Sequence, residues 1–258
     1  MAVDVDDRLI FKFPRDDIAE RALVREASLL AVVRPSVSMT VPDLSIERGP
    51  PLFSRHPKLK GRHLLTADYD ALPEDARRRL GNDLAHFYTE LHRLDGSRMA
   101  AAGALPIGAW QTTDAIRSRA LPALSPPFQE YAKQAIAEFE RLRPDPYGDT
   151  YGFFDGHGRN MAFDHAHGRI NGIYDFADSG FGPLHQDFIC SNFISPDLTG
   201  RIVSAYEALT GRLLDRGRIA LLTSIHRLSE LAELADDPAH APAMIRSVTD
   251  WAAVRPVP

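Results

Sequence analysis

The chain begins with a spacing of hydrophobic and polar residues that is typical of a strand followed by a helix. Residues 8–13 alternate charged and apolar side chains, which predicts a strand with one exposed face. Residues 14–33 place apolar side chains at helical spacing, behind a proline and two aspartates that favour a helix start. Five prolines between residues 35 and 57 exclude a long helix there and favour short strands, over residues 41–46 and 51–55. The pattern therefore predicts a small first lobe, residues 1–57.

Helical spacing dominates the rest of the chain. Residues 74–94 carry four leucines and a phenylalanine at steps of three and four, and residues 128–142 carry a similar apolar stripe. Further helices are predicted over residues 188–193, 199–209, 216–235 and 244–251. These stripes predict a second lobe, residues 58–258, that is mostly helical.

Short strands interrupt this helical lobe near its middle. Apolar segments separated by glycines predict strands over residues 151–154, 161–163 and 170–174. Residues 164–168, with the sequence DHAHG, suit the hairpin turn that would join the last two. The predicted fold class is therefore α+β with two lobes, a small one rich in strands and a larger helical one.

Composition adds limits on partners and compartment. The 258 residues are 44% hydrophobic and 25% charged, with a formal net charge of −5, values that are ordinary for a soluble globular protein. Mild acidity argues against nucleic acid and membrane as partners, since both surfaces are anionic. Cys190 is the only cysteine, which excludes an intrachain disulfide, and no apolar stretch is long enough to cross a membrane. These features predict a cytoplasmic protein.

The most informative polar residues are Asp155, Asn160 and Asp175. Each lies at the end of a predicted strand or in a glycine-rich loop, where side chains converge on open sites. The predicted hairpin brings Asn160 and Asp175 to one edge, within reach of a single Mg²⁺, with Asp155 beside them as a base. The alternative is that all three are ordinary turn residues, a common use of Asp and Asn.

Glu26 gives an independent indication in the first lobe. On a helical wheel it falls in the middle of the apolar face of the first predicted helix, where an unpaired charge would cost several kcal/mol. Lys12, on the preceding strand, is the nearest cation in sequence. A strand lysine paired with a helix glutamate is a known arrangement for holding phosphates. A purely structural ion pair is the alternative.

The histidines near the predicted hairpin, His157, His165 and His167, raise the question of a metal site. His165 and His167 fall at the tip of the predicted turn. Metal ligands need a fixed surrounding shell, which a hairpin tip does not supply, so solvated turn histidines are the favoured interpretation.

These parts occur in the order found in protein kinases: a strand lysine, a helix glutamate, Asp-x₄-Asn, and Asp-Phe after a hairpin. In detail the chain resembles the aminoglycoside phosphotransferase and choline kinase family, which has a protein-kinase-like fold. The resemblance rests on residues 11–15 (FKFPR), 25–30 (REASLL), 84–95 (LAHFYTELHRLD), 155–160 (DGHGRN) and 172–183 (GIYDFADSGFGP).

The resemblance implies a role for each of five residues. Asp155 would accept the proton of the substrate hydroxyl, and Asn160 and Asp175 would bind Mg²⁺. Lys12 and Glu26 would hold the phosphates of ATP or GTP. The implied activity is transfer of the γ-phosphoryl group to a hydroxyl of a small molecule, such as an aminoglycoside, choline or a sugar.

The resemblance also implies a hinge and a support for the catalytic loop. Residues 54–58 would form the hinge whose backbone meets the purine, with His56 and Lys58 as nucleotide-binding residues. Asp187 resembles the family's aspartate that steadies the catalytic loop.

Two departures from the family pattern bear on activity. Phe153 and Phe154 stand where the family usually has His-Gly before the catalytic aspartate, so the hydrogen bonding of the loop is expected to differ. Only eleven residues precede Lys12, fewer than two strands and a phosphate-covering loop need. We therefore expect either an upstream start or a shortened lobe that binds nucleotide weakly. The alternative function is a pseudokinase that binds a ligand or partner without catalysis.

Overall fold

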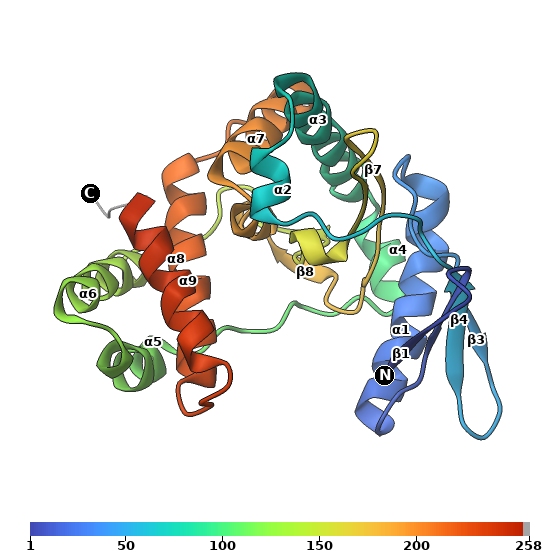
Figure 1. Cartoon of the computed structure of the whole chain (residues 1–258), viewed down its shortest axis with the longest axis horizontal. Coiled ribbons are helices and arrows are strands. Elements are labelled where there is room, and N and C mark those ends of the chain that lie inside the picture. Colours follow the sequence, from blue (N-terminus) through green and yellow to red (C-terminus); the bar gives the residue numbers. More distant parts are fainter. Residues whose placement is uncertain (255–258) are drawn as a thin grey trace. The chain divides into compact units, whose positions relative to one another are not determined.

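A computed structural model of the chain describes residues 1–254 (Figure 1). Its first element is an antiparallel sheet with the strand order β1-β2-β4-β3. The strands are β1 (Ala2–Val5), β2 (Leu9–Lys12), β3 (Ser45–Glu47) and β4 (Phe53–Pro57). The register pairs Lys12 with Ser54 and Ile10 with His56. The strand predicted over residues 8–13 is therefore confirmed.

The sequence analysis missed β1 and placed two strands imprecisely. Asp6 and Asp7 turn the chain between β1 and β2 with φ of 54° and 52°, a left-handed pair that aspartate tolerates better than most residues. The strand predicted over residues 41–46 is wrong over most of its length, since only Ser45–Glu47 is extended and paired. The strand predicted over 51–55 begins two residues later, after Pro50 and Pro51, which have no N–H for a ladder.

Helix α1 (Asp17–Val33) follows the first hairpin, as its apolar spacing predicts. The Asp16 side chain caps it by accepting a hydrogen bond of 2.8 Å from the Ala19 N–H. Leu23, Leu29, Leu30 and Val33 are buried along one face, and Glu26 is buried among them. The helix thereby fixes one carboxylate against the sheet.

Four further α-helices belong to the same part of the chain: α2 (Thr66–Asp70), α3 (Glu74–Leu91), α4 (Gly96–Ala101) and α7 (Pro196–Thr210). Helices α3 and α7 pack along each other, with Leu80, Leu84 and Leu91 of α3 fully buried. The helix predicted over residues 74–94 is confirmed, apart from its last three residues. Helix α3 also packs against strands β5 (Asp149–Gly152) and β7 (Arg169–Ile173) of two short antiparallel pairs.

Two short antiparallel pairs carry the polar loop residues. Strand β5 (Asp149–Gly152) pairs with β8 (Gly180–Pro183), and β6 (Met161–Asp164) pairs with β7 (Arg169–Ile173). The hairpin predicted around residues 164–168 is confirmed, while β8, rich in glycine, was not predicted. The helix predicted over residues 188–193 is wrong, because two 3₁₀ turns, Leu184–Phe188 and Cys190–Phe193, occupy this stretch.

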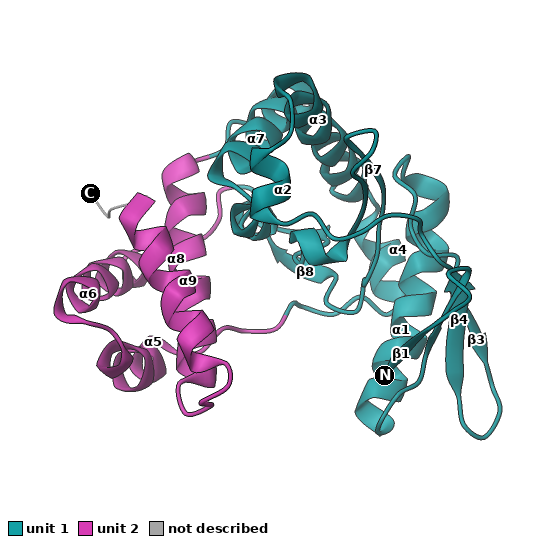
Figure 2. Ribbon diagram, viewed as in Figure 1, with its two compact units in different colours: residues 1–107, 147–214 teal, residues 108–146, 215–258 magenta. Residues whose placement is uncertain are grey.

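The described chain divides into two compact units (Figure 2). Unit 1 contains residues 1–107 and 147–214, and unit 2 contains residues 108–146 and, of the described residues, 215–254. Unit 2 consists of α5 (Thr113–Ala115) with the π and 3₁₀ turns that follow it, α6 (Pro126–Glu140), α8 (Arg216–Leu234) and α9 (Ala241–Val254). Ile136, Ile225 and Leu228 lie in its apolar core. The lobe boundary after residue 57 stays a prediction.

Across residues 1–254, none of the helices combines the length and the apolar character needed to span a bilayer.

Candidate active site

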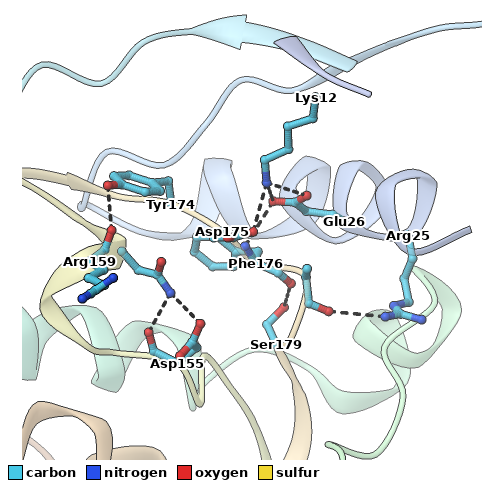
Figure 3. A network of polar contacts seen from close by, with 11 residues as sticks. Lys12, Arg25, Glu26, Asp155, Arg159, Tyr174, Asp175, Phe176 and Ser179 are labelled. Atoms are coloured by element: carbon cyan, nitrogen blue, oxygen red, sulfur yellow. Dashed lines mark hydrogen bonds and ion pairs between the residues drawn. The ribbon is translucent and has the colours of Figure 1, made fainter. Parts of the chain in front are cut away.

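Lys12 joins the sheet, α1 and the end of the β6–β7 hairpin (Figure 3). Its Nζ lies 3.0 Å from Glu26 Oε1 and 3.0 Å from Asp175 Oδ1. Glu26 is 2% exposed and also accepts a hydrogen bond of 3.1 Å from the Phe176 N–H. The predicted Lys12–Glu26 ion pair is therefore confirmed, and the pair fixes the residue that follows Asp175.

Both carboxylate oxygens of Asp155 have a polar neighbour in the loop. Asn160 Nδ2 donates to Asp155 Oδ2 at 2.6 Å and to the Asp155 carbonyl at 3.0 Å. His157 Nε2 lies 3.2 Å from Asp155 Oδ1. His157 Nδ1 accepts a hydrogen bond of 3.2 Å from the Arg159 N–H, so both ring nitrogens of His157 are engaged within this loop. The loop thus presents a carboxylate of fixed orientation.

Asp187 is fully buried and binds the backbone just before Asp155. Its carboxylate accepts hydrogen bonds from the N–H groups of Phe153, at 3.1 Å, and of Phe154. His92 Nε2 lies 2.9 Å from Asp187 Oδ2, and His92 Nδ1 lies 2.9 Å from the Tyr206 hydroxyl. A chain of buried polar groups therefore anchors the two residues that precede Asp155.

Unusual backbone conformations and aromatic packing occur in the loop around Asp155 and at the end of the β6–β7 hairpin. Phe154 and Asp175 have φ of 58° and 67°, left-handed values that cost a non-glycine residue about 1–2 kcal/mol. Strain of this kind persists where surrounding contacts over-determine the backbone, and it concentrates at functional sites. The Phe153 ring packs 4.8 Å from Phe176 and 6.0 Å from Phe87, centroid to centroid. Aromatic packing therefore occupies the position where the family usually has histidine.

The hairpin brings Asn160 and Asp175 to one edge, as expected. The Tyr174 N–H donates to the Asn160 carbonyl at 3.0 Å, and the Tyr174 hydroxyl donates to the Arg159 carbonyl at 2.7 Å. In the described chain, Asn160 Oδ1 and Asp175 Oδ2 accept no hydrogen bond. One amide oxygen and one carboxylate oxygen fit the preference of Mg²⁺ for few protein ligands beside phosphates and water.

A cavity of about 680 Å³ lies beside Lys12 and Asp175 within unit 1. The sheet contributes Ile10, Lys12 and His56 to its wall, and the segments that follow contribute residues 58–65 in part, Asp68, His165 and Tyr174. The volume lies in the range of sites for small molecules and cofactors. Both residues predicted to bind nucleotide from the hinge, His56 and Lys58, line this cavity.

Lys58 is engaged by carboxylates of the first hairpin. Its Nζ lies 2.5 Å from Asp4 Oδ2 and 2.6 Å from Asp7 Oδ1. Lys60 also contacts Asp7, with 2.5 Å between Lys60 Nζ and Asp7 Oδ2. The ammonium of Lys58 therefore ties the β1–β2 hairpin to the segment after β4.

Charges near the site shift the pKa values of its two central groups. Burial lowers the pKa of Lys12, but the neighbouring charges of Glu26 and Asp175 outweigh it, and the net pKa is raised. Burial raises the pKa of Asp155, aided by the negative charges of Asp178 and Asp175 and opposed by His157 and Asn160. A raised pKa makes the Asp155 carboxylate a better proton acceptor near neutral pH.

Two contacts of the site escaped the sequence analysis. His157 was interpreted as a turn residue, yet it contacts Asp155, and His92 was not singled out, yet it contacts Asp187. The signal for His157 was its position two residues after Asp155 in a glycine-rich loop, where a tight turn brings such neighbours together. His165 and His167 do lie at or beside the hairpin turn.

Solved structures that match the chain define its class of fold. The GDP complex of a single-substitution mutant of aminoglycoside 2'-phosphotransferase-IIIa matches with a TM-score of 0.84 and 19% identity, covering 98% of this chain and 88% of that one. The streptomycin–ATP ternary complex of APH(2")-IIa matches with a TM-score of 0.64 and 15% identity, covering 97% and 90%. Macrolide 2'-phosphotransferase MphH from Brachybacterium faecium matches with a TM-score of 0.64 and 20% identity, covering 93% and 84%. The chain thus has the protein-kinase-like fold of these antibiotic phosphotransferases.

The sequence itself identifies the family. The model of the phosphotransferase enzyme family matches residues 2–222, and the chain belongs to that family. Among curated proteins, no sequence matches this chain significantly. The α+β two-lobed fold and the family resemblance expected from the sequence are both confirmed.

Proposed function

We propose that this phosphotransferase moves the γ-phosphoryl group of ATP or GTP to a hydroxyl group of a small molecule. The observation that carries the proposal is the junction at Lys12, whose ammonium lies 3.0 Å from carboxylates of both α1 and the β6–β7 hairpin. A lysine in such a junction serves phosphate binding in kinase-like sites. The cavity that Lys12 and Asp175 line supplies the space for a nucleotide.

Asp155 is the proposed proton acceptor. The hydroxyl oxygen of the acceptor forms a bond to the γ-phosphorus while the bond from that phosphorus to the β–γ bridging oxygen breaks, which releases the nucleoside diphosphate. The hydroxyl proton passes to Asp155, whose carboxylate retains free lone pairs beside the hydrogen bond from Asn160 and the contact with His157. The hydrogen bonds to Asp187 hold the preceding backbone while this happens.

Asn160 and Asp175 are the proposed ligands of Mg²⁺. When bound, the ion would neutralise charge on the phosphate oxygens. Lys12 would contact the phosphates from the sheet, and Glu26 would keep its ammonium in place.

The acceptor class is open to a direct screen. Release of nucleoside diphosphate is followed with Mg²⁺ and ATP or GTP against a panel of aminoglycosides, macrolides, choline, amino alcohols and sugars. Activity with one class of hydroxyl compound supports the proposal. Nucleotide binding without turnover on any member of the panel favours the pseudokinase alternative.

Two substitutions test the assigned roles with the acceptor that the screen identifies. Asp155→Asn should lower kcat about 10²–10⁴-fold, the contribution typical of a general base, with nucleotide affinity nearly unchanged. Asp175→Asn should weaken both turnover and Mg²⁺-dependent nucleotide binding, since a metal ligand also acts in the ground state. Asp149→Asn, at an exposed position at the start of β5, is the matched control. Unchanged turnover in Asp155→Asn would contradict the assignment.

A further inference from the structure

One face of the sheet forms a wall of the nucleotide cavity, and the register defines which side chains it presents. Directly paired residues of antiparallel strands share a face, and side chains alternate along each strand. Lys12 pairs with Ser54 and Ile10 pairs with His56, so these residues lie on one face of the sheet. Ile10, Lys12 and His56 all line the cavity, in agreement with the register.

The same register gives the direction of the cavity along this wall. His56 lies one step of the pleat beyond the Lys12–Ser54 pair, which places it ~7 Å from Lys12 along the sheet. Lys12, with Asp175, marks the end where the phosphates are proposed to bind. The base of a nucleotide lies at the opposite end from its phosphates, so His56 is on the side of the base.

The hydrogen bonds of His56 determine its tautomer. Its Nδ1 lies 2.9 Å from the Pro57 carbonyl oxygen, which can only accept, so Nδ1 carries a proton. The side chain is largely buried, and burial lowers the pKa of His56, with the charge of Lys12 acting in the same direction. The ring is therefore neutral, and its Nε2 is a bare acceptor. Among the described residues, no group donates a hydrogen bond to this nitrogen.

We propose that His56 makes the site select adenine over guanine nucleotides, with Nε2 accepting a hydrogen bond from the 6-amino group. This inference rests on the proposed function. Adenine carries an amino donor at position 6, where guanine carries a carbonyl oxygen. With adenine the bare nitrogen gains a donor, whereas with guanine two acceptors face each other and both lose their hydrogen bonds to water.

The cations on the same wall do not offset this preference. Guanine O6 would need a donor, and the ammonium groups that line the cavity are those of Lys12, on β2, and of Lys58, directly after β4. Lys12 is held by Glu26 and Asp175, and Lys58 is held by Asp4 and Asp7. Among the described sheet residues that line the cavity, His56 thus offers a base an acceptor that no other group occupies.

Titration calorimetry with Mg²⁺ and non-hydrolysable β,γ-imido nucleotides tests the inference without an acceptor substrate. The probes are the adenosine analogue, the guanosine analogue and the purine riboside analogue that has hydrogen at position 6. The wild-type chain should bind the adenosine analogue at least about tenfold more tightly than either of the others, the ratio expected for one unpaired buried polar group. In His56→Met, which removes the acceptor, the three affinities should agree within about threefold.

Arg55→Met is the matched control, because Arg55 neighbours His56 on the opposite face and its side chain is 52% exposed. This variant should retain the wild-type preference. Equal or tighter binding of the guanosine analogue by the wild-type chain overturns the inference, as does an adenine preference that survives in His56→Met. If His56→Met does not fold, the comparison of the adenosine and purine riboside analogues on the wild-type chain decides. If the wild-type chain binds none of the three, the proposed function itself fails, an outcome distinct from equal binding of all bases.

Discussion

Lys12 lies on β2 and Lys58 directly after β4, and each bridges two carboxylates, yet their surroundings differ. Lys12 Nζ lies 3.0 Å from both of its partners; Asp175 is 50% exposed, but Glu26 is only 2% exposed. Lys58 Nζ lies closer to its partners, at 2.5 and 2.6 Å, but Asp4 and Asp7 are 41% and 67% exposed. The shorter distances are therefore found at the bridge whose carboxylates are both open to solvent. Burial of the carboxylate, more than the length of the contact, determines what each bridge contributes.

The comparison extends to Asp187, the most deeply buried carboxylate of the site. Removing one partner from a buried arrangement leaves charges or N–H groups that no water can reach, which is costly. Removing one partner from an exposed pair returns both groups to solvent, which costs little. The following substitutions test this ordering.

The largest loss of stability is expected for Asp187→Ala. The change leaves the N–H groups of Phe153 and Phe154 without an acceptor and removes one of the two partners of His92. The free energy of unfolding should fall by about 3–5 kcal/mol, as measured by urea denaturation. Asp187→Asn keeps one acceptor oxygen and should lose less. A loss of stability below about 1 kcal/mol in Asp187→Ala would contradict the anchoring role.

Glu26→Ala should have the next largest effect, a loss of about 3 kcal/mol, because it leaves Lys12 and the Phe176 N–H without their buried acceptor. The double substitution Lys12→Met with Glu26→Leu replaces the pair by apolar groups of similar size and should recover the part of that stability that the unpaired ammonium costs, while the Phe176 N–H stays without its acceptor. The double variant should bind nucleotide far more weakly than the wild-type chain, because it lacks the Lys12 ammonium. A double variant as unstable as Glu26→Ala would show that the stability depends on more than the pair.

The bridge at Lys12 should also give the chain a stability loss at alkaline pH. The pKa of Lys12 is raised in the folded state, so the stabilising contribution is complete below the ordinary lysine pKa of 10.5 and disappears as the pH rises through the higher folded value. Urea denaturation between about pH 10 and pH 12 should therefore show a steeper decline for the wild-type chain than for Glu26→Gln. Parallel pH curves for the two proteins would refute this linkage.

The smallest effect is expected for Asp7→Asn at the exposed bridge. Hydrogen bonds from Lys58 and Lys60 hold the pKa of Asp7 at about 2, but the carboxylate is open to solvent. The change in urea midpoint should be slight in low salt and should vanish in about 1 M NaCl, where the Debye length is short. A large and salt-independent loss would mean that exposure does not separate the two bridges.

Much of the fold could be predicted from sequence because its signals are local. The stripes of α1 and α3 and the β6–β7 hairpin lie close to where the hydrophobic pattern predicts them. The Lys12–Glu26 pair was predictable because a carboxylate in the middle of an apolar stripe needs a partner. These inferences depend on few residues at short range.

The remaining features depend on contacts between distant parts of the chain. Strand β8 is short and glycine-rich, and its strand character comes from pairing with β5, far away in sequence. The division into units was not predicted, since each unit is assembled from two separate segments. The contact of His157 with Asp155 depends on a backbone turn whose geometry the hydrophobic pattern does not encode.

The position of Lys12 along the chain has a consequence for synthesis on the ribosome. Its partner Glu26 follows after 14 residues, whereas Asp175 follows after 163. At translation rates of about 5–20 residues per second, Asp175 is made roughly 8–33 s after Lys12. During that interval the first hairpin and α1 can form their own ion pair, while the second half of the junction does not yet exist. In the nascent chain the Lys12–Glu26 ion pair can therefore form first. The ion pair with Asp175 can form only after the β6–β7 hairpin has been made.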